Sequence, residues 1–425
     1  MASISVAMGN GVLIDSFGAR DAGAAGVFGG LSGDSLAAMQ TNPAAMGFLS
    51  QNEWTVSVRS GWGWGEYSKG GVRYDMDIIG AVPEIGVAWR PRSEDFTIGL
   101  SVAPLAASAA DWSYPDAPGG IGGVTYGADH PHDAGFLAIR INGGVAWRIS
   151  DSVSIGASLG AVYSRIDFDA PFIFQTNPAL SGAKVDLDLE SDGWEAMAEV
   201  GAVWKLNDST RVALRYRPQV DLNLSGKADA DFSAQLPVLG LGGAPSYATY
   251  RATTRNALPA LAGGGMEWQP GDRWKIGFWV DWIGWSDAFD DLEVNLSNGT
   301  NGVINGAIGQ QVSDRVPVRW KDTWVVGLGS ELRLSDCLSL RAGWRYGQSP
   351  VRSTYATPLN ASLLEHTLAV GLGWGRGEWD VDLSYEYQFG GSAEVFRSGY
   401  QAGEYDRSKI DLGAHLLGFG LSRRF

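Results

Sequence analysis

The regular alternation of short and long connections between hairpin strands is the feature that most constrains how this chain can fold. Residues 53–425 read as successive segments in which apolar and polar side chains alternate, which is the period of a β-strand. In Trp379–Phe389, the clearest segment, one face is apolar and largely aromatic, and the other carries Asp, Ser, Glu and Gln. Such a strand fits a soluble sandwich, with its polar face in water, or a membrane barrel, with its apolar face in lipid.

The connections distinguish these two folds. Short polar turns alternate with long connections along the whole chain, as in outer-membrane barrels, where periplasmic turns are tight and outer loops extended. Counted around six short turns, the chain predicts an all-β fold, a 14-stranded antiparallel transmembrane β-barrel over residues 51–425 in the bacterial outer membrane. The short turns are 90–95, 150–152, 207–210, 269–273, 335–336 and 375–378, and the long connections lie near 104–134, 169–185, 226–250, 298–318, 349–363 and 391–408.

Tryptophans mark one end of the predicted strands. Seven of them stand next to a short turn, so in a barrel they would form one ring at the membrane interface. If these tryptophans simply packed in a core, they would have no reason to follow one class of turn. The seven are Trp89, Trp147, Trp204, Trp268, Trp274, Trp374 and Trp379.

The last strand ends in an aromatic residue, as does the C-terminal signal read by the outer-membrane barrel assembly machinery. We therefore expect this machinery as a partner through Phe425, with outer-membrane lipids and lipopolysaccharide around the barrel. Ile410 and Leu412 fall on the opposite face from the later apolar residues, which predicts a bulge near Gly413. Those later residues are Leu417, Phe419, Leu421 and Phe425.

Composition excludes several other classes. The net charge of −15 opposes binding to nucleic acid, whose phosphates are contacted by basic surfaces. No apolar run has the roughly 18–20 residues that a membrane helix needs. The single Cys337 cannot form an internal disulfide and offers no paired ligand, so we expect no metal site and no cofactor. Residues 1–6 lack the basic and apolar parts of a secretory signal, and we expect that the signal has been removed.

Residues 1–50 lack strand alternation and predict a separate plug inside the barrel lumen, here called the hatch. Ser35–Gln40 predicts a short helix with Asp34 as its cap. Asn42-Pro43 should end this helix, because the residue before a proline is pushed out of the helical region. The many apolar side chains of the segment favour an ordered plug over a disordered tail, and a lumen of this size has room for one.

Charges of both signs fall on the inward faces of the predicted strands. They could anchor a ligand carboxylate, or they could form a salt-bridged network that only holds the barrel together. The network is the simpler interpretation of any single residue, since buried charges need partners. No motif identifies a carboxylate-binding residue. The inward charges are Glu195, Glu199, Arg215, Arg217, Lys275, Asp281, Lys321, Arg341, Arg345, Asp380, Asp382 and Glu386.

An ordered set of motifs extends over nearly the whole chain. The strongest is Thr41-Asn42-Pro43-Ala44-Ala45-Met46, which follows Gly18-Ala19-Arg20 and Asp34-Ser35. Together the motifs resemble the FadL-type outer-membrane transporters of long-chain fatty acids, a family that includes toluene- and xylene-uptake channels. The remaining motifs lie at 102–106, 215–218, 258–260, 272–274, 282–286, 320–324, 340–344 and 348–351.

The resemblance implies passive uptake of hydrophobic small molecules, either long-chain fatty acids or hydrocarbons, across the outer membrane. Family members capture apolar ligands in an outer-loop groove and pass them to a pocket beside the hatch. The ligand then leaves sideways through a gap in the wall at a kink in the third strand. In this chain, Pro104 lacks the backbone donor that a closed wall would need.

The same resemblance implies three groups of site residues. The gap would lie at Ala103, Pro104, Ala106 and Ala107. The hatch would contact ligand through Phe17, Phe28, Asn42, Pro43, Ala44 and Met46. The outer-loop groove would be formed by Phe172, Ile173, Phe174, Leu180, Leu236, Val238, Leu239 and Leu241.

Two other functions stay open. A general diffusion porin would keep a water-filled lumen without an apolar plug. A barrel enzyme would need a nucleophile with a base, or an Asp–His arrangement, and His130-Pro131-His132-Asp133 is the candidate. A solvated loop is the simpler interpretation of these histidines, and we expect neither catalytic residues nor an enzyme.

Overall fold

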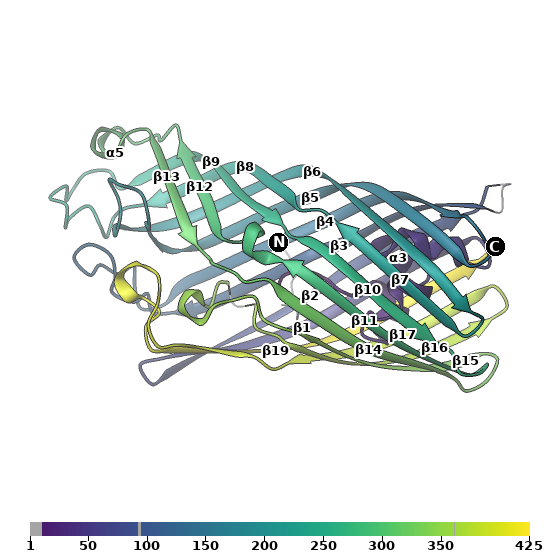
Figure 1. The fold of residues 1–425 in the computed structure, drawn as a ribbon. Helices are drawn as coiled ribbons and strands as arrows, with labels where there is room; N and C mark the ends of the chain where they lie inside the picture. The colour runs from purple at the N-terminus through teal and green to yellow at the C-terminus, as the bar shows by residue number, and fades with distance from the viewer. Residues whose placement is uncertain (1–10, 92–94, 361) are drawn as a thin grey trace.

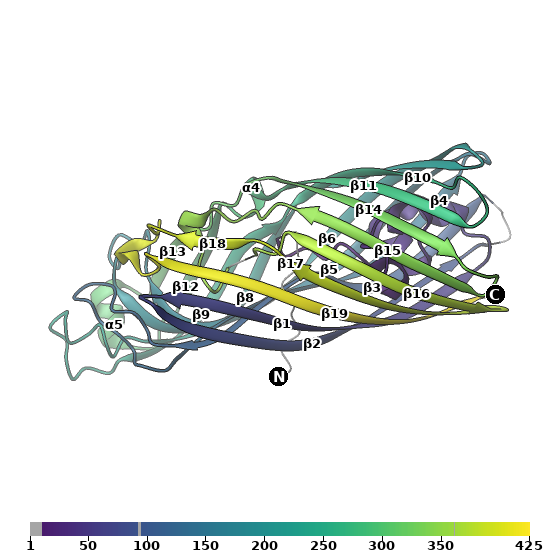
Figure 2. The same ribbon diagram turned by 90° about the horizontal axis from the view of Figure 1, so that it is seen from below.

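The computed structural model describes residues 11–91, 95–360 and 362–425, so the first ten residues of the predicted hatch lie outside the described chain. The described strands form one antiparallel sheet that closes on itself. Closure occurs at β1 (Glu53–Lys69), which pairs with β2 (Val72–Trp89) on one side and with β19 (Ser408–Arg424) on the other. Figure 1 shows the resulting barrel from the side and Figure 2 from below. None of the described helices is both long and apolar enough to cross a membrane.

Nineteen strand segments in the described chain make up fourteen wall strands, which confirms the predicted fold class. Pro218 and Pro259 interrupt two of the wall strands, because proline cannot donate to the ladder. The other continuous strands are β3 (Phe96–Tyr114), β4 (His130–Arg148), β5 (Val153–Ile173), β6 (Lys184–Asn207), β15 (Leu338–Gly347) and β16 (His366–Arg376). The interrupted strands are β7 (Thr210–Arg217) with β8 (Val220–Asp231), β9 (Tyr247–Leu258) with β10 (Ala260–Trp268), β11 (Trp274–Gly284) with β12 (Asp291–Ser297), β13 (Gln311–Pro317) with β14 (Thr323–Arg333), and β17 (Trp379–Phe389) with β18 (Ser392–Val395).

Several connections expected to be long loops are shorter than predicted. The connection predicted at 104–134 changes most, because β3 continues to Tyr114 and β4 already begins at His130. The outer connection between β1 and β2, which the turn pattern did not reveal, is a two-residue turn at Gly70 and Gly71. Their φ values of 60° and 82° are those of a tight hairpin, which only glycine adopts readily. The other connections contain the short helices α5 (Gly302–Ile308), η2 (Ser353–Tyr355) and η3 (Gln401–Gly403), and α4 (Trp285–Ala288) lies where β11 and β12 are interrupted.

The outer surface of the barrel carries the predicted aromatic ring. All seven turn-flanking tryptophans are exposed, with accessible fractions between 41% and 54%. Since each strand alternates between lipid and lumen, their common orientation fits the interfacial girdle predicted from sequence.

The bulge predicted at Gly413 is absent. β19 pairs with β1 without a shift from Arg424 opposite Glu53 to Ser408 opposite Lys69. Ile410 and Leu412 therefore point into the lumen, whereas Leu417 points to lipid and is 63% exposed. The apolar face of the strand changes sides because the outer half of the lumen is itself apolar.

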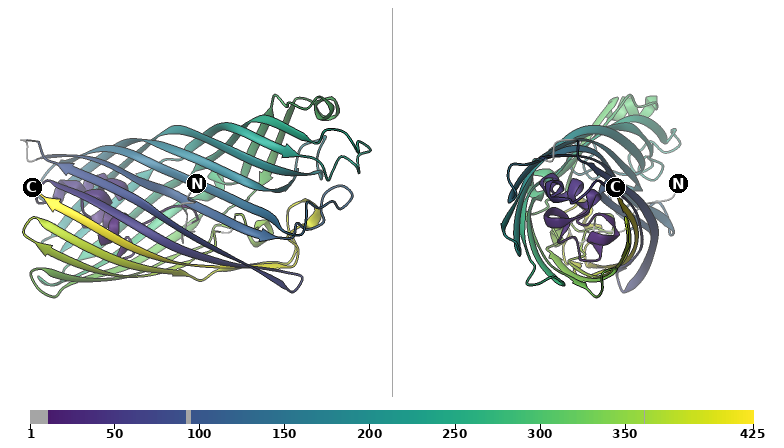
Figure 3. Two further views of the ribbon diagram at one scale, coloured as in Figure 1. Left: turned by 180° about the vertical axis from the view of Figure 1, so that it is seen from behind. Right: turned by 90° about the vertical axis from the view of Figure 1, so that its right-hand side faces the viewer.

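Helices of the N-terminal segment lie inside the ring of strands (Figure 3, right), near the end of the barrel that holds the C-terminus (Figure 3, left). As predicted, Asp34 caps α3, its Oδ1 accepting hydrogen bonds from the N–H groups of Leu36 at 3.1 Å and Ala37 at 2.9 Å. Asn42 ends α3 in an extended conformation, and its Oδ1 accepts from the Ala44 N–H at 3.1 Å. These helices are α1 (Gly18–Ala22), α2 (Gly29–Ser32), α3 (Ser35–Thr41) and η1 (Pro43–Phe48).

Candidate functional site

Backbone pairing between β2 and β3 stops well before either strand ends. Their ladder has five pairs, from Trp89 opposite Ile98 to Ile85 opposite Val102. Beyond these pairs β2 runs on to Val72 and β3 to Tyr114 with no further ladder between them. In a closed barrel every wall strand is paired along both edges, so this unpaired stretch is the weak part of the wall.

The third strand is irregular at this place. Its pairing with β4 shifts by one residue between Pro104 and Ala106, so β3 continues past the proline with a bulge. Pro104 therefore does not end the strand at the outer rim.

The N-terminal segment covers the unpaired edge of β3 from inside. Leu13 forms an antiparallel bridge with Ala106. The Ile14 N–H donates to the Leu105 carbonyl at 2.9 Å, and the Ala107 N–H donates to the Val12 carbonyl at 2.8 Å. Residues 12–14 thus occupy the position that β2 would take beside β3. Three of the predicted gap residues, Ala103, Ala106 and Ala107, are buried as a result.

A buried ion-pair cluster fastens the same segment to β2. The Gly18 N–H donates to Glu84 Oε2 at 2.8 Å. Arg59 of β1 lies 2.8 Å from Glu84 Oε1 and 3.8 Å from Glu386 Oε2, and the three side chains are at most 3% exposed. Buried charges are tolerated where they are paired in this way. The hatch is therefore held on both sides of the unpaired stretch.

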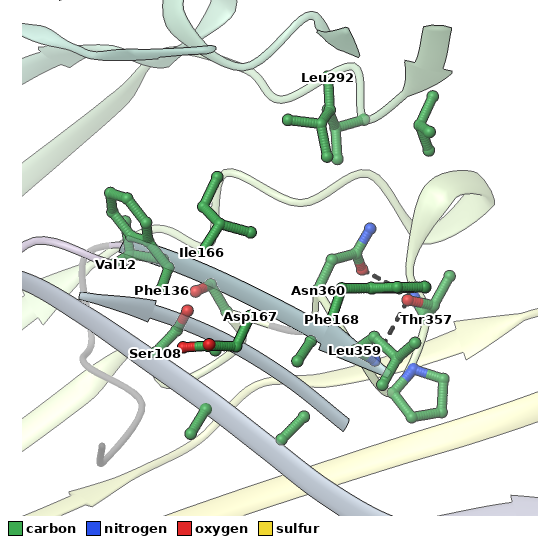
Figure 4. A pocket seen from close by; sticks show the side chains of 18 of the residues that line it. Val12, Ser108, Phe136, Ile166, Asp167, Phe168, Leu292, Thr357, Leu359 and Asn360 are labelled. Atoms are coloured by element: carbon green, nitrogen blue, oxygen red, sulfur yellow. Dashed lines mark hydrogen bonds between the residues drawn. The ribbon is translucent and has the colours of Figure 1, made fainter. Parts of the chain in front are cut away.

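A cavity of about 260 Å³ lies in the outer half of the lumen, and Val12 is among the residues that line it. The strands on either side of the unpaired stretch both line it: Met76 and Ile78 come from β2, and Ser108–Ala110 from β3. Figure 4 shows Val12, Phe136 and Ile166 on one side and the loop with Thr357, Leu359 and Asn360 on another. Further apolar lining residues are Phe168, Phe172, Ile173, Leu187, Leu189, Phe289, Leu292, Val294, Val316, Val318, Trp320 and Leu412.

The predicted groove residues do not form one surface. Phe172 and Ile173 line the cavity, whereas Phe174, Leu180 and Leu236 are buried in the apolar core of the outer loops. Leu241 packs against that core. Val238 and Leu239 alone in this set face solvent, with exposed fractions of 48% and 45%.

None of the six predicted hatch residues lines this cavity, because all of them pack tightly between the hatch and the wall. The Asn42 amide donates to the carbonyls of Gly30 and Leu214, each at 3.2 Å. A side chain at Gly156 of β5 would collide with the backbone of Ala44. Asn42 and its neighbours hold the hatch in place. The remaining members are Phe17, Phe28, Pro43 and Met46.

The inward charges form the network that the simpler interpretation predicts. Three of the predicted charges are exceptions. Lys321 is exposed, and neither Arg217 nor Glu195 makes an ion pair with the described residues, Glu195 accepting instead from Asn223. The pairs are Arg140–Glu199 (2.8 Å), Arg215–Asp281 (2.9 Å), Lys275–Glu331 (3.3 Å), Arg345–Asp15 (3.2 Å), Arg341–Asp382 (2.5 Å) and Arg424–Asp380 (2.8 Å).

The two candidate histidines lie at the outer end of β4. His130 Nε2 is 2.8 Å from Asp186 Oδ1, and His132 stacks on Tyr114 with ring centroids 3.7 Å apart. Among the described residues, neither ring is hydrogen-bonded to a Ser, Thr or Cys side chain, and no group of His, Cys, Asp and Glu is suited to a metal ion.

Sequence analysis missed the residues that close the cavity from the far side. Phe289 and Trp320 stack with centroids 4.6 Å apart, and residues 357–360 with Ser362 complete the lining. One signal was present in the sequence. Ile410 and Leu412 point inward because the outer lumen is apolar. In the sequence alone, this arrangement and a bulge produce the same alternation of apolar residues.

Comparison with known proteins agrees with the fold. The family model described as "Outer membrane protein transport protein (OMPP1/FadL/TodX)" matches residues 1–425. A "Long-chain fatty acid transport protein" of Salmonella typhi is 21% identical over 73% of this chain and 70% of its own length. A crystal structure of a Pseudomonas aeruginosa FadL homologue has a TM-score of 0.79 at 17% identity, covering 98% of this chain and 100% of that one. The Pseudomonas putida toluene transporter TodX has a TM-score of 0.73 at 16% identity, with coverage of 98% and 100%.

Proposed function

Because the chain belongs to the outer-membrane transport protein family OMPP1/FadL/TodX, we propose that it takes up hydrophobic small molecules passively through the apolar cavity and sideways between β2 and β3. The family consists of outer-membrane channels and not of enzymes. Its relatives include proteins named for long-chain fatty acids and for toluene, so both ligand classes enter the proposal.

The observation that carries the proposal is the meeting of the cavity with the unpaired stretch of wall. Met76 and Ile78 on one strand and Ala109 and Ala110 on the other line the same space. No β2–β3 ladder separates them from the outside. An unpaired backbone inside a bilayer costs several kcal/mol per group, so a barrel without a use for the opening would be expected to close it.

The outward side chains support an exit into lipid. On β2 the exposed face is apolar at Ile79 and Ile85, and on β3 it is apolar at Val102. The exposed charges Asp77 on β2 and Asp111 on β3 lie further toward the outer end. The unpaired stretch therefore spans the outer part of the apolar band, where a hydrophobic ligand would partition directly into the membrane.

We place entry at the outer loops. Val238, Leu239 and Ile121 are exposed apolar residues there, with accessible fractions between 42% and 48%. Phe172 and Ile173 connect the loops to the cavity, since both line it. In this scheme Val238, Leu239 and Ile121 capture the ligand. The ligand then passes Phe172 and Ile173 on its way into the cavity.

The hatch, residues 1–50, and the barrel, residues 51–425, would act as separate units. The helices of the hatch fill the periplasmic half of the lumen, which favours lateral release over diffusion straight through a porin. The outward apolar faces would contact outer-membrane lipids and lipopolysaccharide, and the exposed Phe425 would be read by the assembly machinery.

Uptake into proteoliposomes tests the proposal. We expect the reconstituted full chain to accelerate transfer of a labelled hydrocarbon or fatty acid, but not to admit sugars in a swelling assay. Steady sugar permeation without hydrocarbon transfer would identify a general porin and overturn the proposed function.

A further inference from the structure

The ionisable groups that line the cavity include acids but no base. Asp167 and Glu404 carry carboxylates, and Tyr400 and Tyr405 carry phenols. None of the described lining residues is Lys, Arg or His. A carboxylate moved out of water into an apolar site needs a cationic or hydrogen-bonding partner to offset its lost hydration.

From this lining we infer that the cavity selects uncharged hydrocarbons, aromatic ones included, and rejects ligands that carry a carboxylate. The inference rests on the proposed function, since it names which of the two ligand classes the same cavity takes.

The two lysines beside Glu404 are already occupied, as is Arg165, whose guanidinium binds the lining carboxylate of Asp167. Lys184 is fully buried beside Glu404, and its ammonium group has three hydrogen-bonding partners. It donates to Asp116, to the Ala117 carbonyl at 2.8 Å and to Glu404 Oε1 at 3.1 Å. An ammonium group has three N–H donors, so none is left for a ligand.

Lys69 likewise donates to the backbone carbonyl of Glu404. A ligand carboxylate entering near Glu404 would therefore meet one ionisable acid and no free donor from these two lysines.

Arg217 is the group that would argue for an anionic ligand. It is 3% exposed, and its Nε and Nη2 lack hydrogen-bond partners among the described residues. However, Arg217 does not line the cavity, and it lies at the end of β7 among the paired arginines Arg140 and Arg215. A carboxylate could reach it only by leaving the cavity.

The aromatic content of the lining fits hydrocarbons. The ring planes of Phe289 and Trp320 stack at 18°, and Phe168 meets Phe172 edge to face at 6.3 Å. Aromatic side chains offer both faces and edges to a bound ring, and these contacts need no charge on the ligand.

Three ligands of nearly one shape test the inference with the full chain in nanodiscs at pH 7.5: 4-ethyltoluene, 4-ethylbenzoate and the methyl ester of 4-ethylbenzoate. We expect the hydrocarbon and the ester to bind, measured by quenching of tryptophan fluorescence. The carboxylate should bind at least about tenfold more weakly, because it differs from the ester mainly in its charge.

The variant Arg217→Gln tests whether Arg217 forms a binding site for the carboxylate. If the carboxylate binds as tightly as the hydrocarbon, and R217Q removes only the carboxylate, then an anion site at Arg217 replaces the inference and uptake remains. If none of the three ligands binds the wild-type chain, the proposed function itself fails. Unchanged hydrocarbon binding by R217Q would show that this variant is folded.

Discussion

Pro83 of β2 and Pro104 of β3 fall opposite each other when the β2–β3 register is carried two residues past its last pair, Ile85 with Val102. Neither residue has an N–H to donate, so the ladder cannot continue through this position. The interruption is local, because Pro83 still pairs with Val58 of β1 and Pro104 with Ile139 of β4. Two facing prolines thus end the pairing at the start of the unpaired stretch, whose later residues Met76, Ile78 and Ser108–Ala110 line the cavity.

Replacing both prolines should let the wall close further. In the double variant Pro83→Val/Pro104→Val we expect the β2–β3 ladder to extend, with about 1 kcal/mol gained per new hydrogen bond. The temperature at which the folded band converts in a heat-modifiability gel should rise, and hydrocarbon uptake should fall several-fold.

Pro218→Val provides the control for this double variant, because Pro218 interrupts a wall strand away from β2 and β3. It should leave uptake unchanged. A double variant that is more stable yet transports at the wild-type rate would contradict a role of the opening in release.

Ala109 is the position at which a bulky side chain should block the path. It lies on β3 in the unpaired stretch, is half-buried and lines the cavity. We expect Ala109→Trp to reduce hydrocarbon uptake at least about fivefold while the barrel still assembles. Substitution of Ala106 or Ala107 is less informative, because both pack under residues 12–14 and overpacking there costs about 1–3 kcal/mol.

The matched control is Ala157→Trp on β5, where the side chain is exposed on the outer face. Uptake and gel mobility of this variant should equal those of the wild type. Equal uptake by both tryptophan variants would redirect attention to a route through the lumen.

A reversible cross-link can test whether residues 12–14 must move. Leu13 and Ala106 are bridge partners, and the Cα separation of such antiparallel pairs suits a disulfide. In a Cys337→Ser background, the variant Leu13→Cys/Ala106→Cys should lose uptake on oxidation and regain it with reductant. Transport that is insensitive to the oxidation state would mean that ligand passes above a fixed segment.

The strands, the aromatic ring and the capped helix α3 were predictable because each depends on a local pattern. Alternation specifies a strand, a short turn locates the girdle, and Asp34 with Pro43 limits the helix. The hatch contacts of Asn42 were not predictable, because its partners are the carbonyls of Gly30 and Leu214, which only folding brings close.

The cavity could not be predicted from local sequence patterns, for the same reason. It combines side chains from strands on both sides of the lumen with residues 357–360 and Ser362 of a connecting loop. The inward turn of Ile410 and Leu412 was visible as a change of parity, but a bulge and an apolar lumen produce the same pattern in one strand. The unbroken pairing of β1 with β19 distinguishes these two explanations, because a bulge would shift the register.

Arg59 should be essential for keeping the lumen closed. Arg59→Met leaves Glu84 and Glu386 buried without their cation, and breaking such a pair costs about 3–5 kcal/mol. Because Glu84 also accepts from the Gly18 N–H, we expect the hatch to loosen and single-channel conductance to rise. Arg73→Met removes an exposed pair with Glu66, worth at most about 1 kcal/mol, and should leave conductance low. Equal conductance in both variants would refute the role of the cluster.

The hatch should be held more firmly in mild acid than at neutral pH. Burial raises the pKa of Asp21 from 3.8 to about 6, against the opposing effects of the Phe17 N–H and Arg345. Between these two values the folded hatch binds more protons than the unfolded one, so its stability falls as pH rises from about 4 to 6 and then levels off.

Hydrogen exchange of α1–α3, corrected for its intrinsic pH dependence, should therefore be slower at pH 5 than at pH 7. Burial also raises the pKa of Asp34, to about 7, which acts in the same direction. Asp21→Asn removes the titrating group at an almost fully buried position and should flatten the change between pH 4 and 6. If this variant kept the full pH dependence, the titration would have to be assigned to Asp34 or another group in the hatch, and Asp21 would have no part in it.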